Sequence, residues 1–82
     1  MITILYFGVL KQRLQTTQEQ LAWEGGTGEQ LLSVLQARGG EWASALQADN
    51  VFRLVINKRI SSWQDWIPTD AEVGLLPPVT GG

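Results

Sequence analysis

The chain has 82 residues, of which 44% are hydrophobic and 17% charged, and this composition predicts one small globular domain and not a disordered chain. Six Lys and Arg residues against eight Asp and Glu residues give a net charge of −2, which argues against a nucleic-acid partner. Cysteine and histidine are absent, so disulfides, thiolate nucleophiles, ordinary zinc sites and Ser–His or Cys–His catalysis are excluded.

No segment suggests a membrane or a secretory route. No apolar stretch approaches the ~18–20 residues that span a bilayer, and the apolar first ten residues lack the basic region of a signal peptide. The acidic residues contain no convincing carboxylate pair for metal binding or acid–base chemistry. We therefore expect a cytoplasmic domain without a bound metal or cofactor and with almost no catalytic groups of its own.

Two strands and a helix are predicted in the first half. Residues 2–7 are apolar on both faces, as in a central strand covered on two sides. Residues 9–14 fit either a helical turn or a loop, and residues 20–24 fit a half-exposed strand. Thr27 and Gln30 match a capping box at the start of an amphipathic helix. A glycine pair at 39–40 predicts the end of this helix.

The second half predicts a short helical piece and three strands. The helical piece covers residues 41–46, and residues 51–56 alternate as a strand that places Phe52, Leu54 and Ile56 on one face. Asn57 and Lys58 fit a hairpin turn, from which a short strand returns at 59–60. After a loop over 63–69 and a turn at 70–71, residues 72–76 form the last strand, which two prolines end.

One main helix among five strands predicts an α+β domain in which the helix packs across one face of a mixed sheet. The first and last strands are the most apolar, so we place them in the middle, side by side and parallel. This is the arrangement of the ubiquitin-like β-grasp fold. The domain is expected to cover residues 1–76, and residues 77–82 a free tail.

The tail is the unusual feature of the sequence. At ~7% glycine usage, two terminal glycines arise by chance in about one chain in 200. Pro77 and Pro78 stiffen the exit from the sheet, and six residues at ~3.3 Å each reach up to ~20 Å. Gly81 and Gly82 have no side chains, so a narrow channel of a partner could admit them and receive the terminal carboxylate. A frayed, inert tail is the alternative.

The ending, residues 72–82, resembles the small subunit of molybdopterin synthase, the MoaD-type sulfur carrier. The motif that carries this resemblance consists of Pro77, Pro78, Val79, Thr80, Gly81 and Gly82. Strand 2–7, residues 41–46 and Asn57 also match the family. The chain departs from it at Asp70 and Ala71, where the family usually has a Gly-Asp turn, and in the leucine pair at 75–76, which replaces a commoner aromatic pair.

The resemblance implies a sulfur-carrier mechanism centred on Gly82. An E1-like adenylyltransferase would use ATP to adenylylate the Gly82 carboxylate, and a sulfur donor system would convert it to a thiocarboxylate. The large catalytic subunit of molybdopterin synthase would then take the tail and pass the sulfur to cyclic pyranopterin monophosphate. The resemblance further implies a heterotetramer of two small and two large subunits. The chain alone would not be an enzyme.

The resemblance also marks a partner-binding patch. Phe7, Ile60 and Leu76 match family positions that form an apolar surface near the tail, and Leu75 is included as their neighbour. Strand alternation places Leu75 and Leu76 on opposite faces, so at most one of them belongs to the core. An apolar patch exposed on so small a protein indicates an interface.

The remaining large and charged side chains favour plainer roles. Trp63 and Trp66 are expected to cover the core, with a place in an interface as the alternative. Trp23 and Trp42 are expected to lie in the core or at its rim. The basic residues Lys11, Arg13, Arg53, Lys58 and Arg59 fit a solvated surface, although they could also steer an acidic partner. Three alternative functions stay open: a sulfur carrier for thiamine or tRNA thiolation, a ubiquitin-like protein modifier, and a passive interaction domain.

Overall fold

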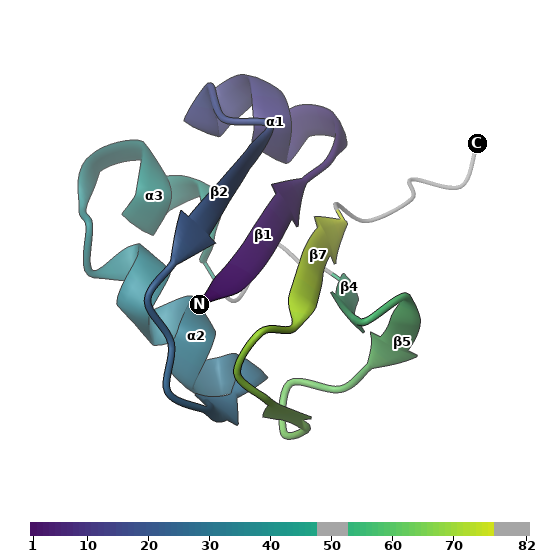
Figure 1. The fold of residues 1–82 in the computed structure, drawn as a ribbon. Helices are drawn as coiled ribbons and strands as arrows, with labels where there is room; N and C mark the ends of the chain where they lie inside the picture. The colour runs from purple at the N-terminus through teal and green to yellow at the C-terminus, as the bar shows by residue number, and fades with distance from the viewer. Residues whose placement is uncertain (48–52, 77–82) are drawn as a thin grey trace.

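A five-stranded mixed sheet organises the molecule in the computed structural model, which describes residues 1–47 and 53–76. Its strand order is β2-β1-β7-β4-β5 (Figure 1). The strands, in that order, are Gln18–Leu21, Ile2–Tyr6, Glu72–Leu76, Arg53–Ile56 and Arg59–Ser61. The central strands β1 and β7 pair in parallel, and the other neighbours pair antiparallel. The predicted pairing of the first and last strands is confirmed.

Helices cover one face of this sheet. They are α1 (Gly8–Leu14), α2 (Gly28–Gln36) and α3 (Gly40–Ala45). The predicted capping box begins α2: Thr27 Oγ1 accepts from the Gln30 amide, and Gln30 Oε1 accepts from the Thr27 amide. Residues 9–14, for which the sequence left helix and loop open, are helical.

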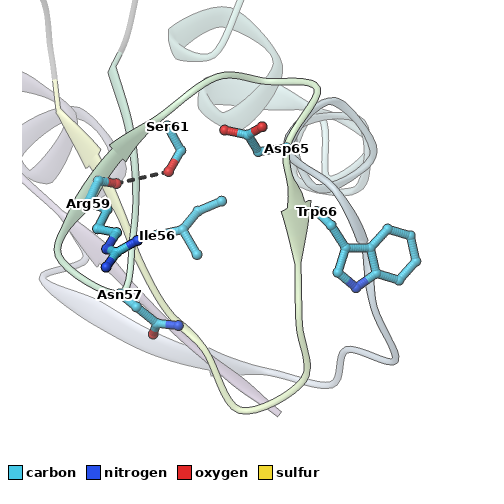
Figure 2. A pocket seen from close by; sticks show the side chains of 6 residues that line it. All are labelled: Ile56, Asn57, Arg59, Ser61, Asp65 and Trp66. Carbon is cyan, nitrogen blue, oxygen red and sulfur yellow. Dashed lines mark hydrogen bonds between the residues drawn. The ribbon is translucent and has the colours of Figure 1, made fainter.

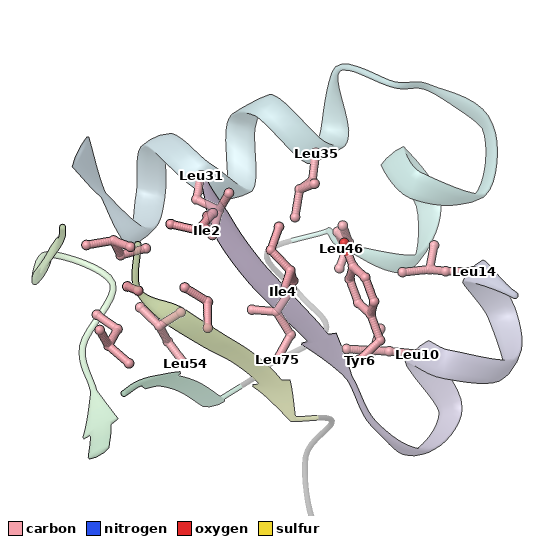
Figure 3. Packing of buried hydrophobic residues seen from close by; sticks show 14 of the residues in the cluster. Ile2, Ile4, Tyr6, Leu10, Leu14, Leu31, Leu35, Leu46, Leu54 and Leu75 are labelled. Carbon is pink, nitrogen blue, oxygen red and sulfur yellow. The ribbon is translucent and has the colours of Figure 1, made fainter. Parts of the chain in front are cut away.

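The core lies between the helices and the sheet (Figure 3). Leu31 and Leu35 of α2 point towards Ile2 and Ile4 of β1. Leu54 and Leu75 extend the same cluster across β4 and β7. Because the helices leave the opposite face of the sheet uncovered, that face can present side chains to a partner. The predicted ubiquitin-like β-grasp fold is confirmed.

A second, two-stranded ladder pairs β3 (Gly26–Thr27) with β6 (Trp66–Ile67), and the sequence did not predict it. It supports the start of α2, where Gly28 N donates to Asp65 O and Glu29 N donates to Trp63 O. These bonds satisfy amide groups that a helix leaves without internal partners.

The predicted strand at 20–24 is shifted: β2 ends at Leu21. Trp23 follows outside the strand, and its indole Nε1 donates to Ile67 O at 2.9 Å, which turns the chain towards β6. The predicted strand 51–56 is observed as β4 from Arg53 onward, and Phe52 lies outside the described residues. Within residues 1–47 and 53–76, no helix is long and apolar enough to cross a membrane.

Candidate functional site at the end of β7

Strand β7 ends at Leu76 and leads into the predicted tail. The tail residues Pro77, Pro78, Val79, Thr80, Gly81 and Gly82 lie outside the described residues, so their role stays a prediction. The structure shows the base from which the tail leaves, between β1 and β4: Leu75 pairs with Tyr6 and with Leu54, and Leu76 pairs with Arg53.

The two leucines at this base face opposite sides of the sheet. Leu75 is 1% exposed and belongs to the core, so its inclusion in the exposed patch was wrong. Leu76 is half-buried on the uncovered face. The alternation of a strand requires this separation, and the helices decide which of the two leucines is buried.

Phe7 lies on the uncovered face because Gly74 leaves room for it. The Phe7 side chain is 41% exposed, directly after β1. A Cβ placed on Gly74 would lie 3.3 Å from Phe7 Cε2 and 3.5 Å from Val55 Cβ. The Phe7 ring therefore lies over the backbone of β7, beside Val55, where a larger residue at position 74 would displace it.

Ile60 extends this apolar surface towards the edge of the sheet. It pairs with Val55 across β4 and β5 and is 70% exposed. Phe7, Val55, Ile60 and Leu76 together form what we call the outer-face patch, which adjoins the point where the tail leaves the domain. Sequence reasoning missed Val55, although its alternation with Leu54 and Ile56 pointed to the uncovered face.

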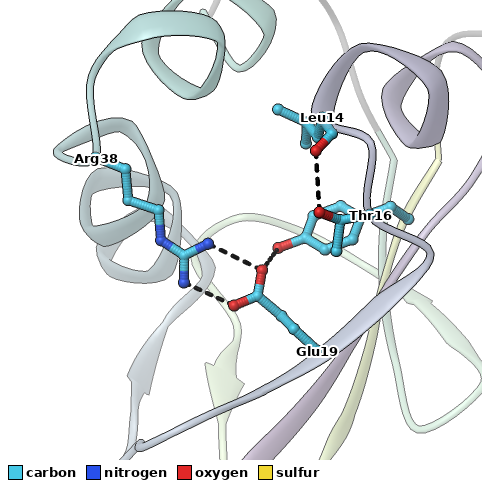
Figure 4. Close-up of polar contacts among 5 residues, drawn as sticks. Leu14, Thr16, Glu19 and Arg38 are labelled. Atoms are coloured by element: carbon cyan, nitrogen blue, oxygen red, sulfur yellow. Dashed lines mark hydrogen bonds and ion pairs between the residues drawn. The ribbon is translucent and has the colours of Figure 1, made fainter.

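A polar cluster joins strands β1 and β2 to α3 and to the residue Arg38, which precedes α3. The two Arg38 terminal nitrogens donate to the two Glu19 carboxylate oxygens at 2.9 and 2.7 Å (Figure 4). Tyr6 Oη donates to Glu19 Oε2 at 2.8 Å. The Arg38 guanidinium carbon lies 4.3 Å from the ring centroid of Trp42, a cation–π contact. The Tyr6 and Trp42 rings meet edge to face, with their centroids 5.5 Å apart.

The electrostatics of this cluster favour a structural role. The hydrogen bonds from Arg38 lower the pKa of Glu19 although burial opposes them, and the same pairing raises the pKa of Arg38. Burial, aided by Glu19, raises the pKa of Tyr6. At neutral pH the carboxylate and guanidinium are therefore charged and the phenol is neutral, so the cluster offers no poised acid or base. Sequence reasoning missed it because Glu19 and Arg38 are 19 residues apart.

The four tryptophans divide into two groups. Trp23, Trp42 and Trp63 are partly buried and pack against the core, as predicted. Trp66 is 63% exposed, so its predicted place over the core was wrong. Its ring lies instead over Gly25, where an added Cβ would approach Trp66 Cζ2 to 2.7 Å.

An open depression of about 510 Å³ adjoins Trp66 and the β4–β5 hairpin (Figure 2). It is lined by Ile56, Asn57, Arg59, Ser61, Asp65 and Trp66. Among the described residues, no group of three acidic side chains lies together to hold a metal ion. The candidate site that remains is the outer-face patch at the end of β7.

A helix packed on a mixed sheet, whose last strand leads into a sequence that ends in Gly-Gly, is the organisation of ubiquitin-like β-grasp proteins. The chain belongs to the ThiS family, whose model matches residues 4–82. It is 30% identical over 82 residues, the full length of both chains, to the molybdopterin synthase sulfur carrier subunit of Escherichia coli (strain K12).

Two solved structures share the fold. A Pyrococcus furiosus protein described as a molybdopterin converting factor, subunit 1, superposes with a TM-score of 0.75 at 20% identity, over 95% of this chain and 97% of that one. SAMP1 from Haloferax volcanii superposes with a TM-score of 0.67 at 16% identity, over 99% of this chain and 98% of that one. At these identities the two likenesses establish the fold alone.

Proposed function

We propose that this chain is the sulfur-carrier subunit of a molybdopterin synthase and that the carboxylate of Gly82 carries the sulfur. The observation that carries this proposal is the full-length similarity to the Escherichia coli sulfur carrier subunit. The Pro-Pro-Val-Thr-Gly-Gly ending supports it, because a carrier needs a reactive end that a partner's active site can admit.

The proposed chemistry begins with activation, because a carboxylate is a poor electrophile. An E1-like adenylyltransferase joins the Gly82 carboxylate to the AMP portion of ATP and releases pyrophosphate. Sulfide-level sulfur from a donor system then attacks the acyl carbon and expels AMP, which leaves a thiocarboxylate. That sulfur attacks a carbon of cyclic pyranopterin monophosphate in the large subunit and displaces the oxygen bonded to that carbon. Hydrolysis of the resulting thioester returns the Gly82 carboxylate and leaves the sulfur on the pterin, and a second charged carrier supplies the second sulfur of the dithiolene.

The outer-face patch is proposed to dock both the activating enzyme and the large subunit. Its apolar side chains surround the base of the tail, so a partner that covers them is placed to receive Gly82. Burial of Phe7 and Ile60 would supply ~25 cal/mol for each Å² of apolar surface removed from water. Sequential use of one patch by two partners also requires that neither binds permanently.

The partner proteins are proposed to supply the pterin-binding groups, the proton-transfer groups and the ATP site. The pterin-binding and proton-transfer groups would belong to the large subunit, since this chain has no histidine or cysteine. ATP would bind to the adenylyltransferase, and this chain would hold no cofactor. The small subunit would therefore act as a co-substrate within a complex, which the family resemblance predicts to be a heterotetramer in the cytoplasm.

Mass spectrometry of the C-terminal peptide tests the proposal. The full chain is co-expressed with its native adenylyltransferase and sulfur donor. We expect Gly82 to carry sulfur in place of one carboxylate oxygen, and alkylation to trap it. Deletion of Gly82 should abolish the modification completely and leave thermal unfolding unchanged, because glycine has no side chain to contribute to the core. An unmodified carboxylate beside an adenylyltransferase shown to be active would contradict the proposal.

The partner that accepts the sulfur separates this function from the alternatives. Co-purification with a thiazole synthase or with a tRNA-thiolating enzyme, in place of a large synthase subunit, would move the chain to another sulfur pathway. Conjugates of higher mass that disappear when Gly82 is deleted would support a protein modifier.

A further inference from the structure

The free edge of the sheet at β5 carries a second recognition surface. We propose that this edge and the cations of the β4–β5 hairpin bind an extended acidic segment of a protein partner, which adds to the sheet as a further strand. The proposal uses the backbone edge of β5 and the hairpin cations, whereas the Ile60 side chain also belongs to the outer-face patch, so an added strand would adjoin that patch.

The backbone of Ile60 offers an unpaired donor and acceptor. Among the strands of residues 1–47 and 53–76, β5 is the last in the sheet order and pairs with β4 alone. In the two-residue hairpin, Ile56 and Arg59 form a hydrogen-bonded pair, so Val55 and Ile60 form the next, non-bonded pair. The amide and carbonyl of Ile60 therefore point away from β4. Such an edge is a template for an added strand.

The hairpin concentrates positive charge on an acidic protein. Three of the six Lys and Arg residues, Arg53, Lys58 and Arg59, lie within residues 53–61, which contain no Asp or Glu, while the whole chain has a net charge of −2. All three are exposed, and across the described ranges none of them forms an ion pair. Unpaired cations beside an open strand edge favour an acidic occupant over a neutral or basic one.

The alternation of β5 specifies which side chains the occupant needs. Ile60 faces the uncovered side with Val55, while Arg59 and Ser61 face the side of Ile56 and Leu54. An added strand that alternates apolar and acidic residues places apolar side chains beside Ile60 and carboxylates beside Arg59. Opposite charges and apolar pairs at such cross-strand positions are each worth about 0.2–1 kcal/mol.

The open depression receives the acidic side of the occupant. Arg59 and Ser61 form one side of it, and Ile56 lies between them and Asp65 (Figure 2). Asp65 is the opposing charge in this depression, and its Oδ2 accepts from the Ser62 amide at 2.9 Å. Asp65 is therefore expected to weaken the binding of an acidic strand. Removal of its charge should then strengthen binding, whereas reversal of the charge of Arg59 should weaken it.

Nuclear magnetic resonance tests the proposal on the full chain labelled with ¹⁵N. The probe is a capped peptide of about ten residues that alternates valine and glutamate. We expect amide shifts at residues 59–61 and slower exchange of the Ile60 amide hydrogen, with unchanged signals in β2 at the opposite edge. A matched peptide that alternates valine and lysine should bind at least about tenfold more weakly.

Matched variants locate the interaction. Ile60→Pro removes the outward amide without removing a bond to β4, and should abolish binding, whereas Ile60→Val keeps the amide and should retain it. Arg59→Glu should weaken binding about tenfold, because a favourable pair becomes a repulsive one. Asp65→Asn should strengthen it about twofold for the same reason, while the asparagine oxygen still accepts from Ser62.

Several results would overturn the proposal. They are the absence of shifts at about 1 mM peptide, equal binding of the lysine peptide, and shifts of residues 59–61 on self-association of the free chain. Binding of single-stranded oligothymidylate at the hairpin in place of the acidic peptide would assign the cations to nucleic acid. If Ile60→Pro unfolds the hairpin, amide exchange in the unsubstituted chain and the Arg59→Glu variant still decide the question.

Discussion

The two faces of β7 have different surroundings, and the change occurs from one residue to the next. On the helix side, Val73 and Leu75 are almost fully buried and hold the sheet to the helices. On the uncovered side, Gly74 and Leu76 belong to a surface that Phe7 and Ile60 complete. Stability and the proposed recognition therefore depend on neighbouring residues of one strand, so we expect that each can be altered without the other.

The largest effect on stability is expected from the inner leucine. Leu75→Ala should lower the free energy of unfolding by about 2–5 kcal/mol, because it leaves a cavity in the core between the helices and the sheet. Leu76→Ala should cost less than about 1 kcal/mol, since that side chain already contacts solvent. Guanidinium denaturation of both variants measures the difference, and equal losses would contradict the division between the faces.

The complementary effect on binding is expected from the outer leucine. Leu76→Asp should weaken binding of the proposed large subunit by about thirtyfold or more, because the complex would bury an unpaired charge. The fold should hold, since an aspartate at this position would face Arg53 across the strands. Titration calorimetry measures the affinity, with Leu76→Ala as the control. Equal binding of the aspartate variant and the unsubstituted chain would remove Leu76 from the patch.

The Glu19–Arg38 pair offers a smaller, pH-dependent test of what fastens the helices to the sheet. Because the pKa of Glu19 is lowered on folding, its contribution to stability is present above the unfolded value of about 4.3 and is lost as the pH falls through the lower folded value. Glu19→Gln should cost about 1–2 kcal/mol at neutral pH.

The dependence of stability on pH, measured for the unsubstituted chain and for Glu19→Gln, tests the direction of this effect. The difference in unfolding free energy between the unsubstituted chain and Glu19→Gln should shrink as the pH falls below about 4. Urea denaturation at several pH values measures it. A constant difference would show that packing of the side chain, and not its charge, stabilises the fold.

The smallest effect is expected at Gly74. Gly74→Ala gains stability from a less flexible unfolded chain but pushes the Phe7 ring outward, so the unfolding free energy should change by less than about 1 kcal/mol. Binding of the large subunit should nevertheless weaken severalfold, because the Phe7 ring moves from its place in the patch. Unchanged affinity would show that Phe7 needs no fixed position.

Local patterns were enough for most of the fold. Thr27 and Gln30 predict the start of α2. The apolar residues 2–7 predict β1, and the alternation over residues 51–56 predicts β4. The pair at β3 and β6 escaped prediction because a two-residue ladder has no periodicity. Trp66 was misplaced because its size suggested burial, whereas its neighbour Ile67 fills the core at that point.

The candidate site was predicted unevenly for a physical reason. Its tail is encoded in consecutive residues, so Gly82 and the prolines could be singled out directly. Its patch joins Phe7, Val55, Ile60 and Leu76 from four separate segments, and only family resemblance or strand register can relate them. The Glu19–Arg38 pair and the unpaired edge at Ile60 could not be predicted for the same reason, because they too depend on how separate segments pair and pack.

By itself the sequence determined the class of domain, the order of the main helix and the five strands of the sheet, the absence of histidine and cysteine chemistry, and the Gly-Gly ending, because composition and periodicity are properties of adjacent residues. The tertiary structure alone decided that Leu75 faces inward and Leu76 outward. It also decided that Phe7 occupies the space over Gly74 and that β5 ends the sheet. These outcomes depend on which strand pairs with which and on the face that the helices cover, and both are set by packing between distant residues.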